Sequence, residues 1–348
     1  FNVMPFGLRN AGQTFQRMMN EFTSDLDNSE PYFDDIMVHA STPEELYKHC
    51  EKLIRKANTW NLRIKKEKVQ IGTEVEFLGH RISAKGVFPL TNNTDAIIQF
   101  PQPTTRRKLQ RFLGMVNYYR QFIPNISAVL QPLNKLTSRN CKFKWTKFHQ
   151  DAFDAAKTCI KNITTLAWPN SPLTLTTDAS GDGIGAVLTN NKQEPIGFAS
   201  KQFTPAEKRY SAIERELLAV VWSFQHFKYY LLGTNFTVVT DHKPLVHFKN
   251  LTLNNRRFVK WMEDLSTYSF NIKHISGSMN KTADALSRST NAIKFTPSDE
   301  INIRNAQQND PITKELFQLI KSKSNKSNIK IPIERLVIHN ELIMEKNS

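Results

Sequence analysis

Apolar residues recur at helical spacing near the start of the chain. Phe15, Met18, Met19 and Phe22 predict a helix over residues 10–22. A second helix is expected to begin at Thr42, with Pro43 at its first position, where proline is favoured. The apolar stripe of this second helix consists of Leu46, Cys50, Leu53, Ala57 and Trp60.

Elsewhere in the first hundred residues the pattern favours strands. The segment PYFDDIMVHA (31–40) is short and β-rich. Residues 68–88 contain VEFLGHRIS, in which alternation interrupted at Gly79 predicts a hairpin. Pro31 cannot donate a ladder hydrogen bond, so we expect its strand to be short or to lie at a sheet edge.

A third helical pattern follows, in a region that prolines divide into short units. Its apolar stripe leaves mainly cationic and amide side chains on the opposite side of the helix. The stripe consists of Leu109, Phe112, Leu113, Val116 and Tyr119. One side is therefore expected to be buried, while the other presents positive charge.

From about residue 171 the pattern changes to strands separated by tight turns. The segments PLTLTTDAS, GIGAVL and PIGFAS precede a long helix from Ser211 to about Tyr230. A strand, NFTVVTD, further helical signals at 243–265, the strand YSFNIKH and a last helix near ADALS complete the order. This order predicts a compact α/β domain with a mixed sheet.

Composition narrows the class of protein. The 348 residues suffice for two or three domains, and the longest apolar run, Leu217–Trp222, is far shorter than the about 20 residues of a membrane-spanning helix. Three widely spaced cysteines suit neither a zinc site nor a disulfide framework, and they indicate a reducing compartment. Because residue 1 is Phe, we expect an internal piece of a longer protein.

The net charge of +15 is unevenly placed. Residues 96–150 hold ten Lys and Arg and no acid, which accounts for two-thirds of the excess. Such a block, interleaved with aromatics, favours a nucleic-acid-binding surface over the alternative of a solvated basic face.

Two sets of acids are candidates for chemistry. Asp34 and Asp35 are adjacent within an apolar β context, so a tight turn must expose them or a cation must neutralise them; taken alone, the pair also fits an ordinary surface turn. Asp178 and Asp241 end apolar strands that should converge, and Glu216 lies on the long helix.

Asp284 opens the last predicted helix, and with the other three acids it forms a set that divalent cations would neutralise. Each acid alone has an ordinary explanation: an Asx turn for Asp178, a solvated helix position for Glu216 and a helix cap for Asp284. All four stand at the ends of elements of one domain or on its helix, which favours a shared site.

Four motifs in order give a resemblance. VMPFGLRNAGQTFQRMM, YFDD, VEFLGH with GVFP, and KLQRFLGMVNYYRQFI resemble the reverse transcriptase of gypsy-class (Metaviridae) long-terminal-repeat retrotransposons. The resemblance implies that YFDD is the metal-binding turn, with Asp34 a ligand of both catalytic ions and Asp35 its neighbour. It further implies nucleic-acid contacts from the nucleotide-site segment, the primer grip and the basic thumb: Phe6, Gly7, Phe77, Leu78, Gly79, His80, Arg106, Arg107 and Arg111.

A second resemblance covers residues 171–289. TDAS, YSAIERELLAVVWS, VVTDHKPL and HISGSMNKTADALSR resemble the ribonuclease H domain of retroviruses and retrotransposons. It implies that Asp178, Glu216, Asp241 and Asp284 hold two Mg²⁺ ions, with Mn²⁺ as an alternative, for cleavage of the RNA strand of RNA–DNA hybrids. The family's Glu-Leu-Leu-Ala string selects Glu216 over Glu214.

Further residues receive roles by the same match. His274 lies where related enzymes carry a histidine that shuttles protons or assists product release, and a strand-end histidine is the equal alternative. Arg256 and Arg257, with Ser180 and Lys243, are expected to contact the hybrid backbone.

We therefore expect an α+β protein, with part of a right-hand polymerase palm and thumb before a ribonuclease H-like domain with a mixed five-stranded sheet. The predicted divisions are 1–95 palm, 96–150 thumb or connection, 151–289 ribonuclease H with a core at 171–289, and 290–348 a linker toward integrase.

The family's earlier palm strand would precede Phe1, so the polymerase is expected to be incomplete and inactive alone. Expected partners are RNA–DNA hybrid, template-primer and other Pol segments, namely protease and integrase, with no membrane. The expected location is cytoplasmic, in a virus-like particle if the element is active, with the nucleus as an alternative. The competing function is a degenerate or domesticated nucleic-acid-binding protein without turnover.

Overall fold

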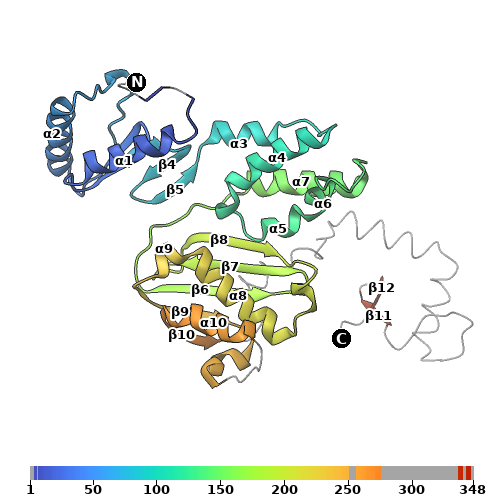
Figure 1. Ribbon diagram of the computed structural model, residues 1–348. Coiled ribbons are helices and arrows are strands. Elements are labelled where there is room, and N and C mark those ends of the chain that lie inside the picture. The colour runs from blue at the N-terminus through green and yellow to red at the C-terminus, as the bar shows by residue number, and fades with distance from the viewer. Residues whose placement is uncertain (1–3, 6, 251–255, 276–335, 340–341, 346–348) are drawn as a thin grey trace, which may run out of the picture. The chain divides into compact units, whose positions relative to one another are not determined.

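The computed structural model describes residues 4–5, 7–250, 256–275, 336–339 and 342–345 (Figure 1). The chain divides into two compact units, residues 1–289 and 290–348. Phe6, Asp284 and the predicted helix near ADALS lie outside the described residues, as does most of the predicted linker. In the described part of the chain, no helix is both long and apolar enough to cross a membrane.

The N-terminal part follows the sequence pattern closely. Thr42 caps the second helix as predicted, because its side chain accepts a hydrogen bond from the Glu45 N–H. Met19, Phe22, Leu53 and Ala57 form a small buried cluster between the two helices. The elements are α1 (Ala11–Thr23), the antiparallel pair β1 (Ser29–Tyr32) and β2 (Asp35–Val38), and α2 (Pro43–Thr59).

The predicted hairpin has a third strand. β3 (Glu74–Phe77), β4 (His80–Ser83) and β5 (Gly86–Pro89) form an antiparallel sheet after the short 3-10 helix η1 (Lys66–Lys68). A distant segment crosses its last turn: the Val87 N–H donates to Leu166 O at 2.8 Å, and the Trp168 indole N–H donates to Ser83 O at 2.8 Å. This pairing joins positions that lie about eighty residues apart in the sequence.

A helical layer follows, and its apolar stripe is buried as predicted. Phe153 and Ile160 share this core, so the helix across the predicted boundary at residue 150 packs with the preceding helices. Val187 and Phe198 of the next sheet also join it. The elements are α3 (Thr91–Ile98), α4 (Arg106–Tyr118), η2 (Arg120–Phe122), α5 (Ile126–Val129), α6 (Gln131–Leu136) and α7 (Lys147–Lys161).

The mixed five-stranded sheet is confirmed, with strand order β10-β9-β6-β7-β8. β7 runs antiparallel to β6 and β8, whereas β9 runs parallel to both β6 and β10. The strands are β6 (Leu173–Ala179), β7 (Gly183–Thr189), β8 (Pro195–Gln202), β9 (Asn235–Thr240) and β10 (Ser269–His274).

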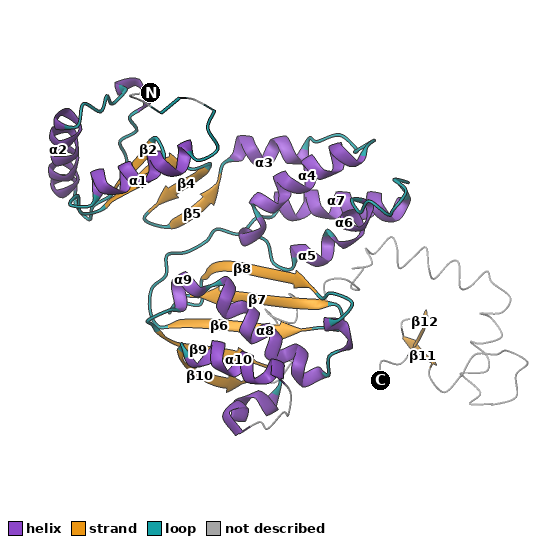
Figure 2. Ribbon diagram, viewed as in Figure 1, coloured by secondary structure: helices purple, strands orange, loops and turns teal. Residues whose placement is uncertain are grey.

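α8 (Ala212–His226) packs against one face of this sheet (Figure 2), and the helical layer meets β7 and β8 on the other. Ala186 and Leu188 share a core with Leu217 and Phe224 of α8, while Val187 belongs to the core of the helical layer. The helical elements of this part are η3 (Glu207–Arg209), α8 (Ala212–His226), α9 (Lys228–Leu231), η4 (Lys243–Asn250) and α10 (Arg256–Ser266). In the second unit, β11 (Leu336–His339) pairs antiparallel with β12 (Leu342–Glu345).

Candidate active site: three carboxylates at the end of a parallel strand pair

Three of the four predicted nuclease acids come together. Asp178 is the sixth residue of β6, and Asp241 directly follows β9. The parallel register pairs Thr176 with Val239, so continuing it by two residues brings Asp178 level with Asp241. Oxygens of Asp178, Glu216 and Asp241 lie within 4.8 Å of one another. The convergence predicted from the strand ends is therefore observed.

Glu216 reaches the two aspartates from α8. A capping box fixes the start of this helix, since Ser211 and Glu214 exchange hydrogen bonds there. Counting on from that start, Glu216 shares a helix face with the fully buried Ala219 and Ser223. The helix thus places a carboxylate, 8% exposed, against the sheet.

The electrostatics of this cluster are unfavourable without a cation. Burial, followed by the negative charges of Asp178 and Asp241, raises the pKa of Glu216 to about 8. Within the described residues, Glu216 Oε2 is buried and receives no hydrogen bond. Three close carboxylates with such an oxygen fit a divalent cation, and all-oxygen donor sets suit Mg²⁺ or Mn²⁺. Asp178, Glu216 and Asp241 are the residues that would hold it.

His274 lies beside the cluster. Its strand β10 runs parallel to β9, with His274 paired to Thr240. The ring is exposed, and its Nε2 lies 3.1 Å from the backbone oxygen of Asp241. A carbonyl can only accept, so Nε2 carries the proton in this contact. The structure therefore places His274 next to Asp241, while its proton-transfer role stays a prediction.

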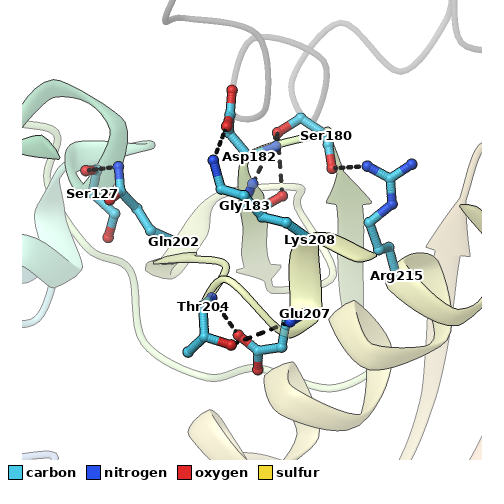
Figure 3. Close-up of polar contacts among 9 residues, drawn as sticks. All are labelled: Ser127, Ser180, Asp182, Gly183, Gln202, Thr204, Glu207, Lys208 and Arg215. Atoms are coloured by element: carbon cyan, nitrogen blue, oxygen red, sulfur yellow. Dashed lines mark hydrogen bonds and ion pairs between the residues drawn. The ribbon is translucent and has the colours of Figure 1, made fainter. Parts of the chain in front are cut away.

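The turn after Asp178 is held by α8 (Figure 3). The Ser180 hydroxyl accepts hydrogen bonds from the backbone N–H groups of Asp182 and Gly183, at 3.2 and 3.1 Å. Arg215 donates to Ser180 O at 3.3 Å, and Lys208 pairs with Asp182. Arg215 was not predicted from the sequence. Its position next to Glu216 is the signal that could have found it.

Arg256 and Arg257 of α10, which were predicted to contact the hybrid, differ in their surroundings. Arg256 is exposed. The Arg257 guanidinium donates to Glu214 at 3.0 Å and stacks over the Tyr210 ring at 4.2 Å. A phosphate at Arg257 would therefore compete with an existing carboxylate. The roles of both arginines stay predictions.

Asp34 and Asp35 lie at a tight turn between β1 and β2, as expected, and both are exposed. Gln16 of α1 braces this turn: its side-chain oxygen accepts from the Phe33 N–H at 2.6 Å, and its amide donates to Pro31 O at 3.1 Å. Phe33 has a left-handed backbone, with φ of 49°. Sequence patterns missed Gln16, because its partners lie fifteen or more residues away.

The predicted primer-grip residues form the β3–β4 turn. Leu78 and Gly79 both have positive φ, and the Tyr118 hydroxyl of α4 donates to Leu78 O. The His80 ring stacks on Tyr118 and on Phe122, with centroids 5.1 and 5.4 Å apart. Burial holds the pKa of His80 below its ordinary value. This turn is therefore anchored on the helical layer.

The remaining candidates are spread over the surface. Gly7 is exposed and has φ of 87°. Arg106 donates to Cys141 O at 2.6 Å, whereas Arg107 and Arg111 are exposed on α4. In the part of the chain that the structure describes, Asp178, Glu216 and Asp241 are the one group of three or more His, Cys, Asp or Glu side chains close enough to share a metal.

Two regions of the chain match models of known protein families. Residues 1–82 match the reverse transcriptase (RNA-dependent DNA polymerase) family model, and residues 168–268 match the RNase H-like domain found in reverse transcriptase. Two successive regions of the chain thus match a reverse transcriptase model and a ribonuclease H-like model. The three clustered acids belong to the second region.

Two transposon polyproteins are similar in sequence to most of this chain. The Retrovirus-related Pol polyprotein from transposon 297 of Drosophila melanogaster is 38% identical over 291 residues, 82% of this chain and 27% of that protein. The Transposon Tf2-3 polyprotein of Schizosaccharomyces pombe is 34% identical over 310 residues, 85% of this chain and 23% of that protein. The chain thus spans about a quarter of the length of these relatives.

Solved structures show the same fold. A foamy viral protease-reverse transcriptase in complex with dsDNA has a TM-score of 0.69 at 24% identity, covering 79% of this chain and 60% of that one. Its complex with RNA/DNA hybrid has a TM-score of 0.68 at 24% identity, with coverages of 78% and 39%. The reverse transcriptase and ribonuclease H-like architecture is therefore confirmed at the level of fold.

Proposed function

We propose that this protein hydrolyses the RNA strand of RNA–DNA hybrids at Asp178, Glu216 and Asp241. The observation that carries the proposal is the approach of the three carboxylates within 4.8 Å at the end of the β6–β9 pair, with Asp178 and Glu216 buried. The match of residues 168–268 to the RNase H-like family supports the same chemistry. That a foamy viral relative is described in complex with RNA/DNA hybrid supports the substrate class.

In this proposal, the chain's residues hold and orient the reacting groups. Bound divalent cations, two Mg²⁺ with Mn²⁺ as the alternative, would activate water and stabilise the leaving oxygen. Asp178 and Asp241 supply carboxylates from neighbouring strand ends, and Glu216 supplies a third from α8. Asp284 is proposed as the fourth acid, and it lies outside the described residues.

We further propose that the chain derives from a gypsy-class Pol polyprotein, with protease and integrase as other segments and a cytoplasmic location. The order of the four reverse transcriptase motifs supports the class. Asp34 is proposed as the polymerase metal ligand, with Asp35 as its catalytic neighbour. The exposure of both on a turn that Gln16 braces from α1 supports this proposal.

Cleavage of a hybrid with an end-labelled RNA strand tests the nuclease proposal. We expect Mg²⁺-dependent cutting of the RNA strand, with the DNA strand left intact. Asp241→Asn should lower the rate by at least about 100-fold, since it removes charge that positions the cations. The control is Asp151→Asn, an exposed acid on α7. Tight hybrid binding without cleavage by the wild type would instead favour a binding protein without turnover.

His274 is expected to contribute to the rate of the same reaction. His274→Ala should slow cleavage by at least about 10-fold, because proton transfer by a positioned side chain typically contributes about 100-fold or more. The measurement is the cleavage rate at saturating Mg²⁺, with hybrid affinity in EDTA measured alongside to separate chemistry from binding. An unchanged rate would show that His274 transfers no proton in the rate-limiting step.

A further inference from the structure

A polar pocket lies at the edge of the five-stranded sheet, apart from the three carboxylates. It has a volume of about 350 Å³ and forms where the end of β8 meets the helical layer and α8. Its lining includes the side chains Arg120, Ser127, Asn134, Lys201, Gln202 and Trp222. The proposed cleavage chemistry uses none of these residues.

The sheet register fixes where this pocket lies relative to the carboxylates. Asp178 pairs with Gly185 on β7, and Gly185 pairs with Ser200 on β8. The three residues therefore form one row across the sheet. Neighbouring strands are about 4.8 Å apart, so the Cα atoms of Ser200 and Asp178, two strands apart, are separated by roughly 10 Å. Ser200 lines the pocket and continues into Lys201 and Gln202.

Arg120 brings a positive charge to the pocket. The side chain is half-buried, and it donates to Ser200 O at 2.7 Å and to Ser127 Oγ at 3.4 Å, both of which are neutral. Among the described residues, no carboxylate lies within 4.0 Å of it, whereas Lys201 pairs with Glu207 at 2.6 Å. Partly buried cations are normally paired, so this guanidinium is suited to an anion.

The charge of Arg120 also acts on a histidine of α8. Burial, followed by the charge of Arg120, holds the pKa of His226 on α8 below its ordinary value. The pocket that contains Arg120 is also lined by the neutral polar residues Ser127, Asn134 and Gln202, and by Trp222. A guanidinium with hydroxyl and amide neighbours is a typical phosphate-binding set.

We propose that this pocket binds a backbone phosphate of the DNA strand of the hybrid whose RNA strand meets Asp178, Glu216 and Asp241. The proposal rests on the proposed nuclease function. A separation on the order of 10 Å is comparable to the width of a duplex groove, so a single hybrid can reach both places with opposite strands. Arg120 is then a positioning residue that fixes the hybrid on the sheet.

The first test measures hybrid affinity against KCl concentration by fluorescence anisotropy, in EDTA so that no strand is cut. Arg120→Gln should weaken binding and lower the slope of log Kd against log salt by about 1, because one phosphate contact is lost. Arg120→Lys should keep the slope. Ser127→Ala removes a hydrogen bond to Ser200 without changing charge, and it should also keep the slope.

A second variant guards against unfolding of Arg120→Gln. Asn134→Asp places a negative charge on an exposed residue of the pocket and should weaken hybrid binding. The matched control is Asn191→Asp, the same change in the exposed turn at the other end of β8, which should bind like the wild type. Equal affinity of both Asn→Asp variants would overturn the proposal.

Single methylphosphonates along the DNA strand then locate the contact. Neutralising one phosphate should weaken binding to the wild type but not to Arg120→Gln; an equal loss in both proteins would overturn the proposal. The cleavage assay separates the two functions. A wild type that cuts the RNA strand while its salt slope is insensitive to Arg120→Gln refutes the pocket alone, and a changed slope without cutting refutes the nuclease alone.

Discussion

Replacing Glu216 by Gln is expected to stabilise the metal-free protein while abolishing RNA cleavage. The carboxylate is buried beside Asp178 and Asp241, and its pKa is raised to about 8, so the folded protein strongly disfavours its charge. Gln has nearly the same shape and no charge. At pH 8.5 without metal, the free energy of unfolding should be on the order of 3–5 kcal/mol higher for Glu216→Gln than for the wild type.

The sign of this effect sets its pH dependence. The folded-state pKa of Glu216 lies above its ordinary value of 4.5, so the folded state binds the proton more tightly than the unfolded state. The wild type is therefore not penalised below about pH 4.5, and it loses stability progressively as the pH rises toward 8. The gap between Glu216→Gln and wild type, measured by thermal unfolding in EDTA, should open over this interval.

Magnesium should reverse the order. A cation bound to the folded state stabilises it by mass action, and the wild type presents the full set of carboxylates to receive it. Adding Mg²⁺ at pH 8.5 should raise the Tm of the wild type more than that of Glu216→Gln. If the two respond equally to Mg²⁺, Glu216 is not a ligand.

Glu214 supplies a matched control on the same helix. Hydrogen bonds from Ser211 and the charge of Arg257 hold the pKa of Glu214 below its ordinary value. Its stabilising contribution is therefore present above about pH 4.5 and is lost as the pH falls. Glu214→Gln should destabilise the protein at neutral pH, which is opposite in sign to Glu216→Gln two residues away.

A second large effect is expected from Gly86→Ala, which should destabilise the protein by roughly 2–4 kcal/mol. Gly86 is buried, with φ of 134°, and an added Cβ would stand 2.1 Å from the backbone oxygen of Leu166. Relief of this overlap would break the hydrogen bond from Val87 N–H to Leu166 O. Urea unfolding of the full chain, with hydrogen exchange at Val87, measures the loss.

Gly114→Ala is the corresponding control. Gly114 lies inside α4 with nothing within 4 Å of an added Cβ. Alanine there should be stabilising by about 0.5–1 kcal/mol, because it lowers the conformational entropy of the unfolded chain. Equal unfolding midpoints for Gly86→Ala and Gly114→Ala would contradict the close approach at Leu166.

Local pattern predicted much of this fold. The strand that carries Asp178 near its end and the strand before Asp241 are short, alternating and bounded by turn residues, so their positions could be inferred from neighbouring residues alone. The start of α8 at Ser211 was likewise encoded within four residues, by its capping box. The convergence of Asp178 and Asp241 was predicted from their places at strand ends, whereas the parallel pairing of β6 and β9 that produces it is seen only in the structure.

What escaped prediction depends on contacts between distant residues. Residues 68–88 were predicted to form one hairpin, whereas β4 pairs with both β3 and β5. The further bridge between Val87 and Leu166 has no local signature in the sequence. The pair of Arg257 with Glu214 joins residues 43 positions apart, so the arginine appeared available for phosphate. Likewise, no periodicity in the sequence indicates that Arg120 donates a hydrogen bond to Ser200 O, eighty residues later.

The contacts on β8 also bear on how the protein behaves at high concentration. β8 is an outermost strand of the sheet, and outermost strands tend to pair with strands of other molecules. Here the carbonyl of Pro195 accepts from the Ala167 N–H, and that of Ser200 accepts from Arg120 and Ser127. Acceptors near both ends of the strand are thus occupied within the chain, which protects it from edge-to-edge aggregation.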